Sequence, residues 1–408
     1  MEIMMQTRGE KMLALRRARN AASPPILRGG YRPFFLGGAT WAVVALALWL
    51  CSLAGLIALP TAFDPLAWHR HEMLFGFVGA VISGFLLTAI PNWTGRLPIA
   101  GWPLAGLFGL WLAARLATLF SGTVGPAVAG LVDTGFYFVL AGVAAREVFE
   151  ANNRNVPIVG MVLLFGIANG LDHLAAAGML VDPALPWQLA VALVTILISL
   201  IGGRIIPSFT RNWLAKHGST QGMPGQPTKF DMATIGLTGL ALLAWISAPS
   251  GWLPGGLLII AAAAQAARLA RWKGWRTARD PLVLVLHVGY LWVPVGLALL
   301  AAVQFGAPLP QSAAVHALTA GAMGTMILAV MTRATLGHTG RELRAGPATT
   351  IIYVLVTIGA ALRVGAPLSF VDYTVGMEVA GLCWLGAFLL FIASYGPILF
   401  APRLGEKI

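Results

Sequence analysis

Twelve long apolar stretches run through the sequence, each close to the roughly 20 residues that a helix needs to cross a hydrocarbon core of about 30 Å. The segments between them are short and rich in glycine, proline and charge, so no soluble module has room to fold there. Only 10% of the 408 residues are charged, whereas soluble domains carry roughly a quarter. The sequence therefore predicts an all-α polytopic membrane protein. The expected spans are 34–57, 67–90, 102–120, 126–145, 157–180, 186–207, 232–248, 252–269, 282–303, 312–331, 348–364 and 374–400.

The basic residues alternate from loop to loop. Of the 27 lysines and arginines, 23 lie before the first span, after even-numbered spans or in the C-terminal tail. Loops on the cytoplasmic side of a membrane carry this excess, so residues 1–32 are expected to form a basic cytoplasmic arm and both termini to be cytoplasmic. The net charge of +12 is thus a topology signal, and it does not indicate nucleic-acid binding.

Spans 2 and 10 look like copies of each other. Placing His71 over His316 without gaps aligns two glycines and a tripeptide that follow. The matched pairs are Gly76 with Gly321, Gly79 with Gly324, and Thr94-Gly95-Arg96 with Thr339-Gly340-Arg341. An internal repeat of this kind indicates an architecture built from copies of one unit.

The prolines that open spans 1, 5 and 9 give the period of the repeat. Pro33, Pro157 and Pro281 are each 124 residues apart. They predict one transmembrane domain, 33–403, of three four-helix repeats in a ring, with a cytoplasmic tail at 404–408. The expected repeats are 33–156, 157–280 and 281–403. Such a ring resembles the main subunit of haem–copper oxidases, in which histidines of the second and tenth helices hold a haem.

Longer motifs cover most of the chain. They are Gly30-Tyr31-Arg32-Pro33-Phe34-Phe35, Trp68-His69-Arg70-His71-Glu72-Met73, the run Gly203–Trp213, Trp275-Arg276 with Asp280-Pro281, and His316-Ala317-Leu318-Thr319 through His338-Thr339-Gly340-Arg341. In these motifs the chain resembles the NnrS family, polytopic proteins of the bacterial nitric oxide response described as containing haem and copper. The resemblance implies a place in the bacterial inner membrane, a role against nitrosative stress, and nitric oxide as ligand or substrate.

Four histidines fall in the outer half of the predicted bundle: His69, His71, His173 and His316. Imidazole suits both haem iron and copper, and it is expensive to bury in hydrocarbon without a partner. The four residues therefore predict a haem or metal cluster. The alternative is a network of hydrogen bonds between helices.

Helical geometry separates His69 from His71, because two residues along a regular helix point about 200° apart. We expect His71 to share a b-type haem with its repeat partner His316. The haem would be held without covalent bonds, because the two cysteines lack the spacing that attaches haem. His69 shares its face with Glu72 and Met73, and imidazole with thioether suits Cu(I). The expected copper ligands are His69, His173 and Met73, with Glu72 a weaker choice.

Three arginines and one further histidine complete the predicted site. Arg70, Arg115 and Arg363 are the basic residues expected near the outer face, where they would pair with haem propionates. The alternative for Arg115 is an ion pair with Asp133. His287 lies nearer the inner side and is an inner haem ligand, a proton relay or a core residue.

Three function classes remain open, because no hydrolase or nucleotide-binding motif is present. The first is a haem and copper protein of the inner membrane that binds or slowly turns over nitric oxide, which makes an oxidoreductase activity one reading. The second is a membrane electron-transfer subunit or sensor, and the third a twelve-helix secondary transporter. An outer haem is most easily reduced by quinol or a periplasmic donor, and nitric oxide reaches it through the lipid bilayer.

Overall fold

Helices account for all the regular structure in the part of the chain that the computed structural model describes, residues 14–15, 18–180, 182–219, 221–248 and 250–406. Twelve helical segments within these ranges are long and apolar enough to cross a membrane, and none of the described residues forms a strand. The predicted fold class is confirmed: the chain is a multi-pass helical membrane protein. Arg8, Lys11, Arg16 and Arg17 of the expected basic arm lie outside the described residues.

Each predicted span corresponds to one helical segment. The first six are α2 (Tyr31–Leu53), the run α3 (Pro65–His71), η2 (Glu72–Val78) and α4 (Gly79–Thr94), then α5 (Trp102–Leu119), α7 (Pro126–Glu150), α8 (Val156–Ala176) and α9 (Leu185–Lys216). The last six are α10 (Lys229–Ser247), α11 (Trp252–Arg271), α12 (Pro281–Gln304), the run α13 (Gln311–His316), η4 (Ala317–Gly324) and α14 (Thr325–His338), then α15 (Pro347–Gly365) and α16 (Tyr373–Phe400). Short helices at η1 (Pro25–Leu27), α6 (Ser121–Val124) and η3 (Gly274–Thr277) lie between them.

Two helices extend furthest beyond their predicted spans. The sixth span was expected to end at residue 207, but α9 continues to Lys216 with Pro207 inside it. The tenth was expected to end at residue 331, and its last turn is at His338. Hydropathy reports only the part of a helix that suits hydrocarbon, so polar turns beyond it are missed.

Acidic caps fix the starts of two helices that bear on the site. Asp64 precedes Pro65, and its carboxylate accepts a hydrogen bond of 2.9 Å from the backbone N–H of Leu66. A side-chain acceptor at this position satisfies a donor that the helix leaves unpaired, and proline fits the first turn because it has no N–H to lose. Asp280 caps α12 in the same way, at 3.0 Å from the N–H of Leu282.

A π-helical segment follows His71 and another follows His316. The first is η2 and the second is η4. The two segments aligned by sequence thus share one local irregularity at the same position. A π-helix holds more residues per turn than an α-helix, and such segments are frequent at functional sites. The regular step of 100° per residue therefore does not hold from Glu72 onward.

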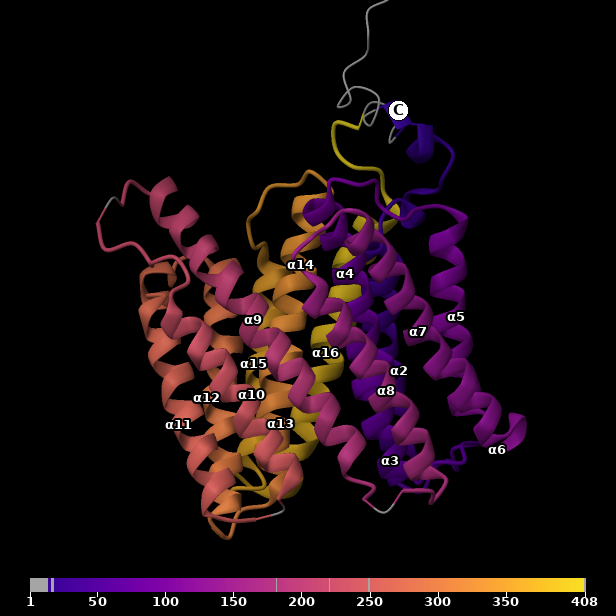
Figure 1. Cartoon of the computed structure of the whole chain (residues 1–408), viewed down its shortest axis with the longest axis vertical. Coiled ribbons are helices and arrows are strands. Elements are labelled where there is room, and N and C mark those ends of the chain that lie inside the picture. Colours follow the sequence, from indigo (N-terminus) through magenta and orange to yellow (C-terminus); the bar gives the residue numbers. More distant parts are fainter. Residues whose placement is uncertain (1–13, 16–17, 181, 220, 249, 407–408) are drawn as a thin grey trace, which may run out of the picture. The chain divides into compact units, whose positions relative to one another are not determined.

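The chain divides into two compact units. The first comprises Met1–Pro186, Ala334–Glu342 and Ile392–Ile408, as far as these ranges are described. In it α7 packs against α5 and α8, and α2 packs against η2 and α4 (Figure 1). The second unit comprises Trp187–Arg333 and Leu343–Phe391, and in it α11 packs against α10 and α12, while η4 packs against α12 and α15.

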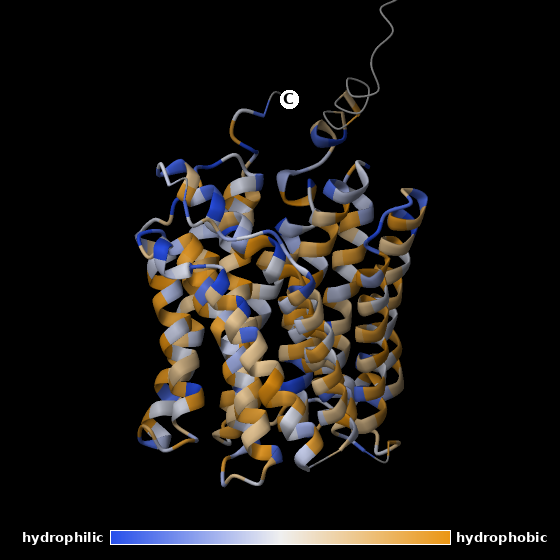
Figure 2. Ribbon diagram, turned by 60° about the vertical axis from the view of Figure 1, so that its left-hand side comes forward, coloured by the Kyte–Doolittle hydropathy of each residue, from blue (hydrophilic) through white to orange (hydrophobic). Residues whose placement is uncertain are grey.

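Apolar residues make up most of each helix, and polar residues gather at helix ends and loops (Figure 2). The three repeats and the likeness to haem–copper oxidases stay predictions.

Candidate metal centre

A cluster of ionisable side chains is buried in the first unit. Its members come from four of the helical spans, and nearly all are sealed from solvent. They are His71 at the end of α3, Glu72 at the start of η2, Arg115 in α5, Asp133 in α7, and Asp172 with His173 in α8. Burying so many ionisable groups is costly unless they are paired or bind a metal ion.

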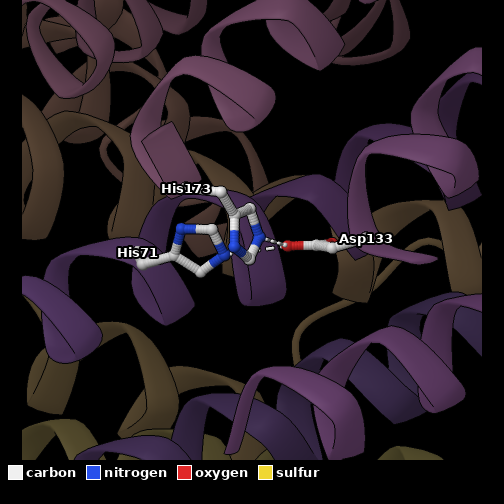
Figure 3. Close-up of side chains that lie close together, drawn as sticks. All are labelled: His71, Asp133 and His173. Atoms are coloured by element: carbon white, nitrogen blue, oxygen red, sulfur yellow. Dashed lines mark hydrogen bonds and ion pairs between the residues drawn. The ribbon is translucent and has the colours of Figure 1, made fainter. Parts of the chain in front are cut away.

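Two imidazoles converge on one carboxylate (Figure 3). The Nε2 atom of His71 lies 2.8 Å from Oδ2 of Asp133, and Nε2 of His173 lies 3.1 Å from the same oxygen. The three ligand atoms all lie within 4.8 Å of one another. Among the described residues, they are the one group of three or more histidine, cysteine or acidic side chains that could hold a metal ion.

Further hydrogen bonds orient this group from outside. Asp172 Oδ2 lies 2.8 Å from Nδ1 of His71, so the side of the ring that faces away from Asp133 also meets a carboxylate. The amide of Asn169 donates a hydrogen bond of 2.8 Å to Asp133 Oδ2. Metal-binding histidines in proteins are held in this way, by a carboxylate that accepts from the second ring nitrogen.

Arg115 balances part of the negative charge. Its guanidinium donates to Glu72 Oε2 at 2.6 Å and forms an ion pair with Asp133. The indole of Trp41 donates to the same Glu72 oxygen at 2.6 Å. The carboxylates of Glu72, Asp133 and Asp172 face the guanidinium of Arg115, and the charge of Arg70 also acts on Asp172. With neutral imidazoles this leaves one negative charge, which a bound cation would cancel.

Two glycines allow η2 and α4 to pack closely beside the cluster. A Cβ at Gly79 would overlap the hydroxyl oxygen of Tyr137, which donates a hydrogen bond to the carbonyl oxygen of Phe75. A Cβ at Gly76 would overlap Oε2 of Glu72 and lie 2.7 Å from the indole nitrogen of Trp41. Glycine therefore sits at these two positions because a side chain would displace Tyr137 at the first and Glu72 at the second.

Phenylalanine rings cover the imidazoles. The ring of Phe63 lies 4.9 Å from His71 and 5.2 Å from His173, and the ring of Phe75 lies 5.1 Å from His71, between centroids. They leave His71 with no exposed surface. Electrostatic interactions are stronger in such an apolar enclosure than in water.

The donor set of the cluster fits a single metal ion. Bonds from imidazole nitrogen and carboxylate oxygen to a metal are about 2.0–2.2 Å long, so ligand atoms that all lie within 4.8 Å of one another need only small shifts to share one ion. Two histidines and one carboxylate suit Cu(II), Fe(II) and Zn(II). A haem iron at His71 is a poorer fit, because Nε2 would first have to leave Asp133.

The other residues expected at a metal or haem site lie apart from this group of three ligands. His69 stacks on Trp49 with ring centroids 4.0 Å apart. Met73, four residues further along the chain, is half-buried. His287 is buried and lies 2.9 Å from the hydroxyl of Thr210. His316 Nδ1 donates to the carbonyl oxygen of Ser312 at 2.7 Å.

Of the three arginines expected to pair with haem propionates, Arg115 instead has the partner that was expected as the alternative, Asp133. It pairs with Asp133 inside the cluster, and its side chain has no exposed surface. Arg70 and Arg363 are half-buried, and Arg363 lies 3.3 Å from the sulfur of Met377.

Sequence reasoning placed His71 and His173 at different sites, whereas the structure brings them together. Asp172 and Asn169 were not singled out. Asp172 carried a signal, because a carboxylate within a predicted span is rare and usually functional, and it directly precedes a histidine that was singled out. Asn169 carried none, because an amide that approaches another helix has no pattern in the sequence.

A second buried polar network, in the second unit, has no excess negative charge. Arg268 donates to Asp231 at 2.9 Å, to the hydroxyl of Tyr290 at 2.9 Å and to Ser199. The Tyr290 hydroxyl in turn donates to Gln265 at 2.6 Å. The carboxylate of Asp231 meets two cations here, Arg268 and, at 3.5 Å, Arg271, so the network holds no excess negative charge, in contrast to the cluster around His71.

The model of one protein family, described as NnrS protein, matches residues 25–403, which is nearly the whole chain. The chain belongs to the NnrS family. The expectation drawn from the sequence motifs is thereby confirmed, and membership links this NnrS chain to the nitric oxide response. No curated protein matches it closely enough to add a more specific activity.

Proposed function

We propose that this NnrS protein acts in the bacterial inner membrane, with both termini in the cytoplasm, as a haem- and copper-containing protein. In this proposal it binds or slowly turns over nitric oxide and so protects against nitrosative stress. Family membership supports the link to nitric oxide. One observation carries the proposal: the imidazoles of His71 and His173 converge on Asp133 in a buried cluster with excess negative charge.

The copper is proposed to lie at His71, Asp133 and His173. Copper bound there would supply a redox-active centre for nitric oxide. The donor set of two imidazoles and a carboxylate suits Cu(II), whereas the thioether site expected at Met73 suits Cu(I). Asp172 would keep a proton on Nδ1 of His71 and so direct Nε2 toward the ion. Nitric oxide is small and apolar enough to reach the cluster from the lipid.

The haem is proposed to use His316. Its Nδ1 donates to Ser312 at 2.7 Å, which leaves the electron pair of Nε2 available for iron. The π-helix η4 begins directly after it, as η2 begins after His71. With His71 assigned to copper, His316 is the one histidine proposed here to hold the haem. Arg363 keeps its proposed pairing with a propionate.

The test is the optical response of purified protein to nitric oxide. Full-length protein in detergent is reduced without oxygen and titrated with nitric oxide, beside His173→Ala and the matched control His217→Ala, since His217 is an exposed loop residue. We expect a saturable spectral change in the wild type and the control. In the His173→Ala variant, the part of the spectral change that depends on copper content should be lost, and the part that depends on haem should remain. A wild-type spectrum that does not respond to nitric oxide in either oxidation state overturns the proposal.

A further inference from the structure

A cavity of about 320 Å³ opens in the first unit, at the end that the charge pattern predicts to be cytoplasmic. Segments far apart in sequence line it: the arm before α2, the end of α4 with the loop after it, His338 at the end of α14, and the C-terminal tail. Backbone bonds join them, since Leu404 N–H donates to Thr339 O at 2.9 Å. Figure 1 shows the C-terminal end beside the N-terminal arm.

Most of the charged residues that line this cavity are arginines. Its lining includes Arg28, Arg32, Arg96 and Arg403 but a single acidic residue, Glu406. Two of these arginines have carboxylate partners. Arg28 lies 3.0 Å from Glu406, and Arg96 lies 2.6 Å from Glu150 outside the cavity and also contacts Glu147.

Arg32 carries a charge that no carboxylate balances. Its residue is only 3% exposed, and one guanidinium nitrogen donates to the carbonyl oxygens of Leu399 and Ala401, at 2.6 and 2.8 Å. Within the described residues it forms no ion pair, and neither does Arg403. Carbonyl groups orient a guanidinium but do not neutralise it, and a buried charge without a counter-ion is costly.

We propose that this cavity binds a phosphate group, either that of an anionic phospholipid or a free phosphate. A guanidinium presents a planar fork of donors that matches phosphate oxygens, and two guanidinium groups here lack an anion. The volume lies in the range of small-ligand sites. Leu87, Pro91 and Leu97 form an apolar part of the wall, which offers a surface for the glycerol end of a lipid beside the phosphate.

The carboxylate of Glu406, which belongs to the chain itself, would compete with the phosphate for the cavity. This carboxylate accepts from the amide of Asn20 at 2.6 Å, from Arg28 at 3.0 Å and from the backbone N–H of Arg403 at 3.1 Å. Phosphate and Glu406 would share Arg28. Removing the charge of Glu406 should therefore strengthen phosphate binding, whereas a residue with only a structural role would weaken it when replaced.

The test uses full-length protein in detergent and two probes, phosphatidylglycerol and inorganic phosphate, with phosphatidylcholine as the background lipid. The midpoint of thermal unfolding is followed against probe concentration for wild type, Arg403→Gln, Glu406→Gln and Arg154→Gln. Arg154 is an exposed arginine outside the cavity, so its variant makes the same charge change elsewhere. Loss of one charged hydrogen bond should weaken apparent affinity about tenfold.

We expect saturable stabilisation that Arg403→Gln weakens, Glu406→Gln strengthens and Arg154→Gln leaves unchanged. Stabilisation by phosphatidylglycerol alone identifies a lipid headgroup, and stabilisation by inorganic phosphate as well identifies a free anion. Two results overturn the proposal: saturation by neither probe, or an Arg154→Gln variant as impaired as Arg403→Gln.

Discussion

The Nδ1 atom of His71 and the Oδ2 atom of Asp172 lie 2.8 Å apart, with both side chains almost fully buried. Asp172 is the immediate neighbour of His173, so a single turn of α8 supplies both a ligand and the residue that orients the other imidazole. On the far side of the same ring, Nε2 of His71 faces Asp133. The His71 ring is thus fixed between two carboxylates. His173 contacts one of them, Asp133.

Replacing Asp172 with asparagine should weaken metal binding without removing a ligand. An amide keeps the size of the side chain but loses the charge that holds the proton on His71 Nδ1. Replacing such a partner costs about 10–100-fold in metal affinity, and this is the range we expect in a competition titration against a chelator. Asp182→Asn, in an exposed loop, is the control. An Asp172→Asn affinity equal to wild type contradicts the orienting role.

Replacing Arg115 with leucine should destabilise the protein strongly, because it leaves Glu72 and Asp133 buried without their counter-ion. Breaking a buried ion pair from one side costs about 3–5 kcal/mol. The double variant Arg115→Leu with Glu72→Leu should recover part of this loss. Thermal unfolding in detergent measures both, and a double variant no more stable than the single one would argue against the pairing.

A methyl group at Gly79 should disturb the cluster through Tyr137. Its Cβ would overlap the phenol oxygen, and overpacking of this kind costs about 1–3 kcal/mol of unfolding free energy. Tyr137→Phe removes that oxygen, so it should rescue Gly79→Ala in part. Gly135→Ala, on the same helix as Tyr137 but with open space around its Cβ, should be tolerated. Equal stability of the two glycine variants would show that the close approach is not required.

The contact of the tail with the arm should weaken in acid. Burial by itself raises the pKa of Glu406, but the N–H of Arg403, the amide of Asn20 and the charge of Arg28 outweigh it and hold that pKa below its ordinary 4.5. A lowered pKa in the folded state means that the carboxylate stabilises the fold above pH 4.5 and that this contribution is lost as the pH falls through the lowered value. The stability difference between wild type and Glu406→Gln should vanish over that range. A difference that does not change with pH would contradict it.

The sequence predicted the fold well because a bilayer imposes one length and one kind of residue on every span. All twelve apolar stretches correspond to helices, and the largest differences are at polar ends, as at Lys216 and His338. The two spans that the sequence aligned also carry π-helices at equivalent positions, after His71 and His316, which the sequence did not predict. Periodicity along one helix could not say which helices pack together, however. The grouping of His173 with His71 depends on how α8 packs against α3 and α7, which no single span encodes.

The claim that copper lies at His71, Asp133 and His173 is tested most directly by copper content in variants of the two rival ligand sets. Full-length protein, loaded with copper and freed of excess, is analysed for wild type, Asp133→Asn, His173→Ala, His69→Ala and Met73→Leu. Our account predicts copper loss in the first two variants and near wild-type copper in the last two, with haem retained throughout. Copper that persists in Asp133→Asn but is lost in His69→Ala and Met73→Leu would contradict it.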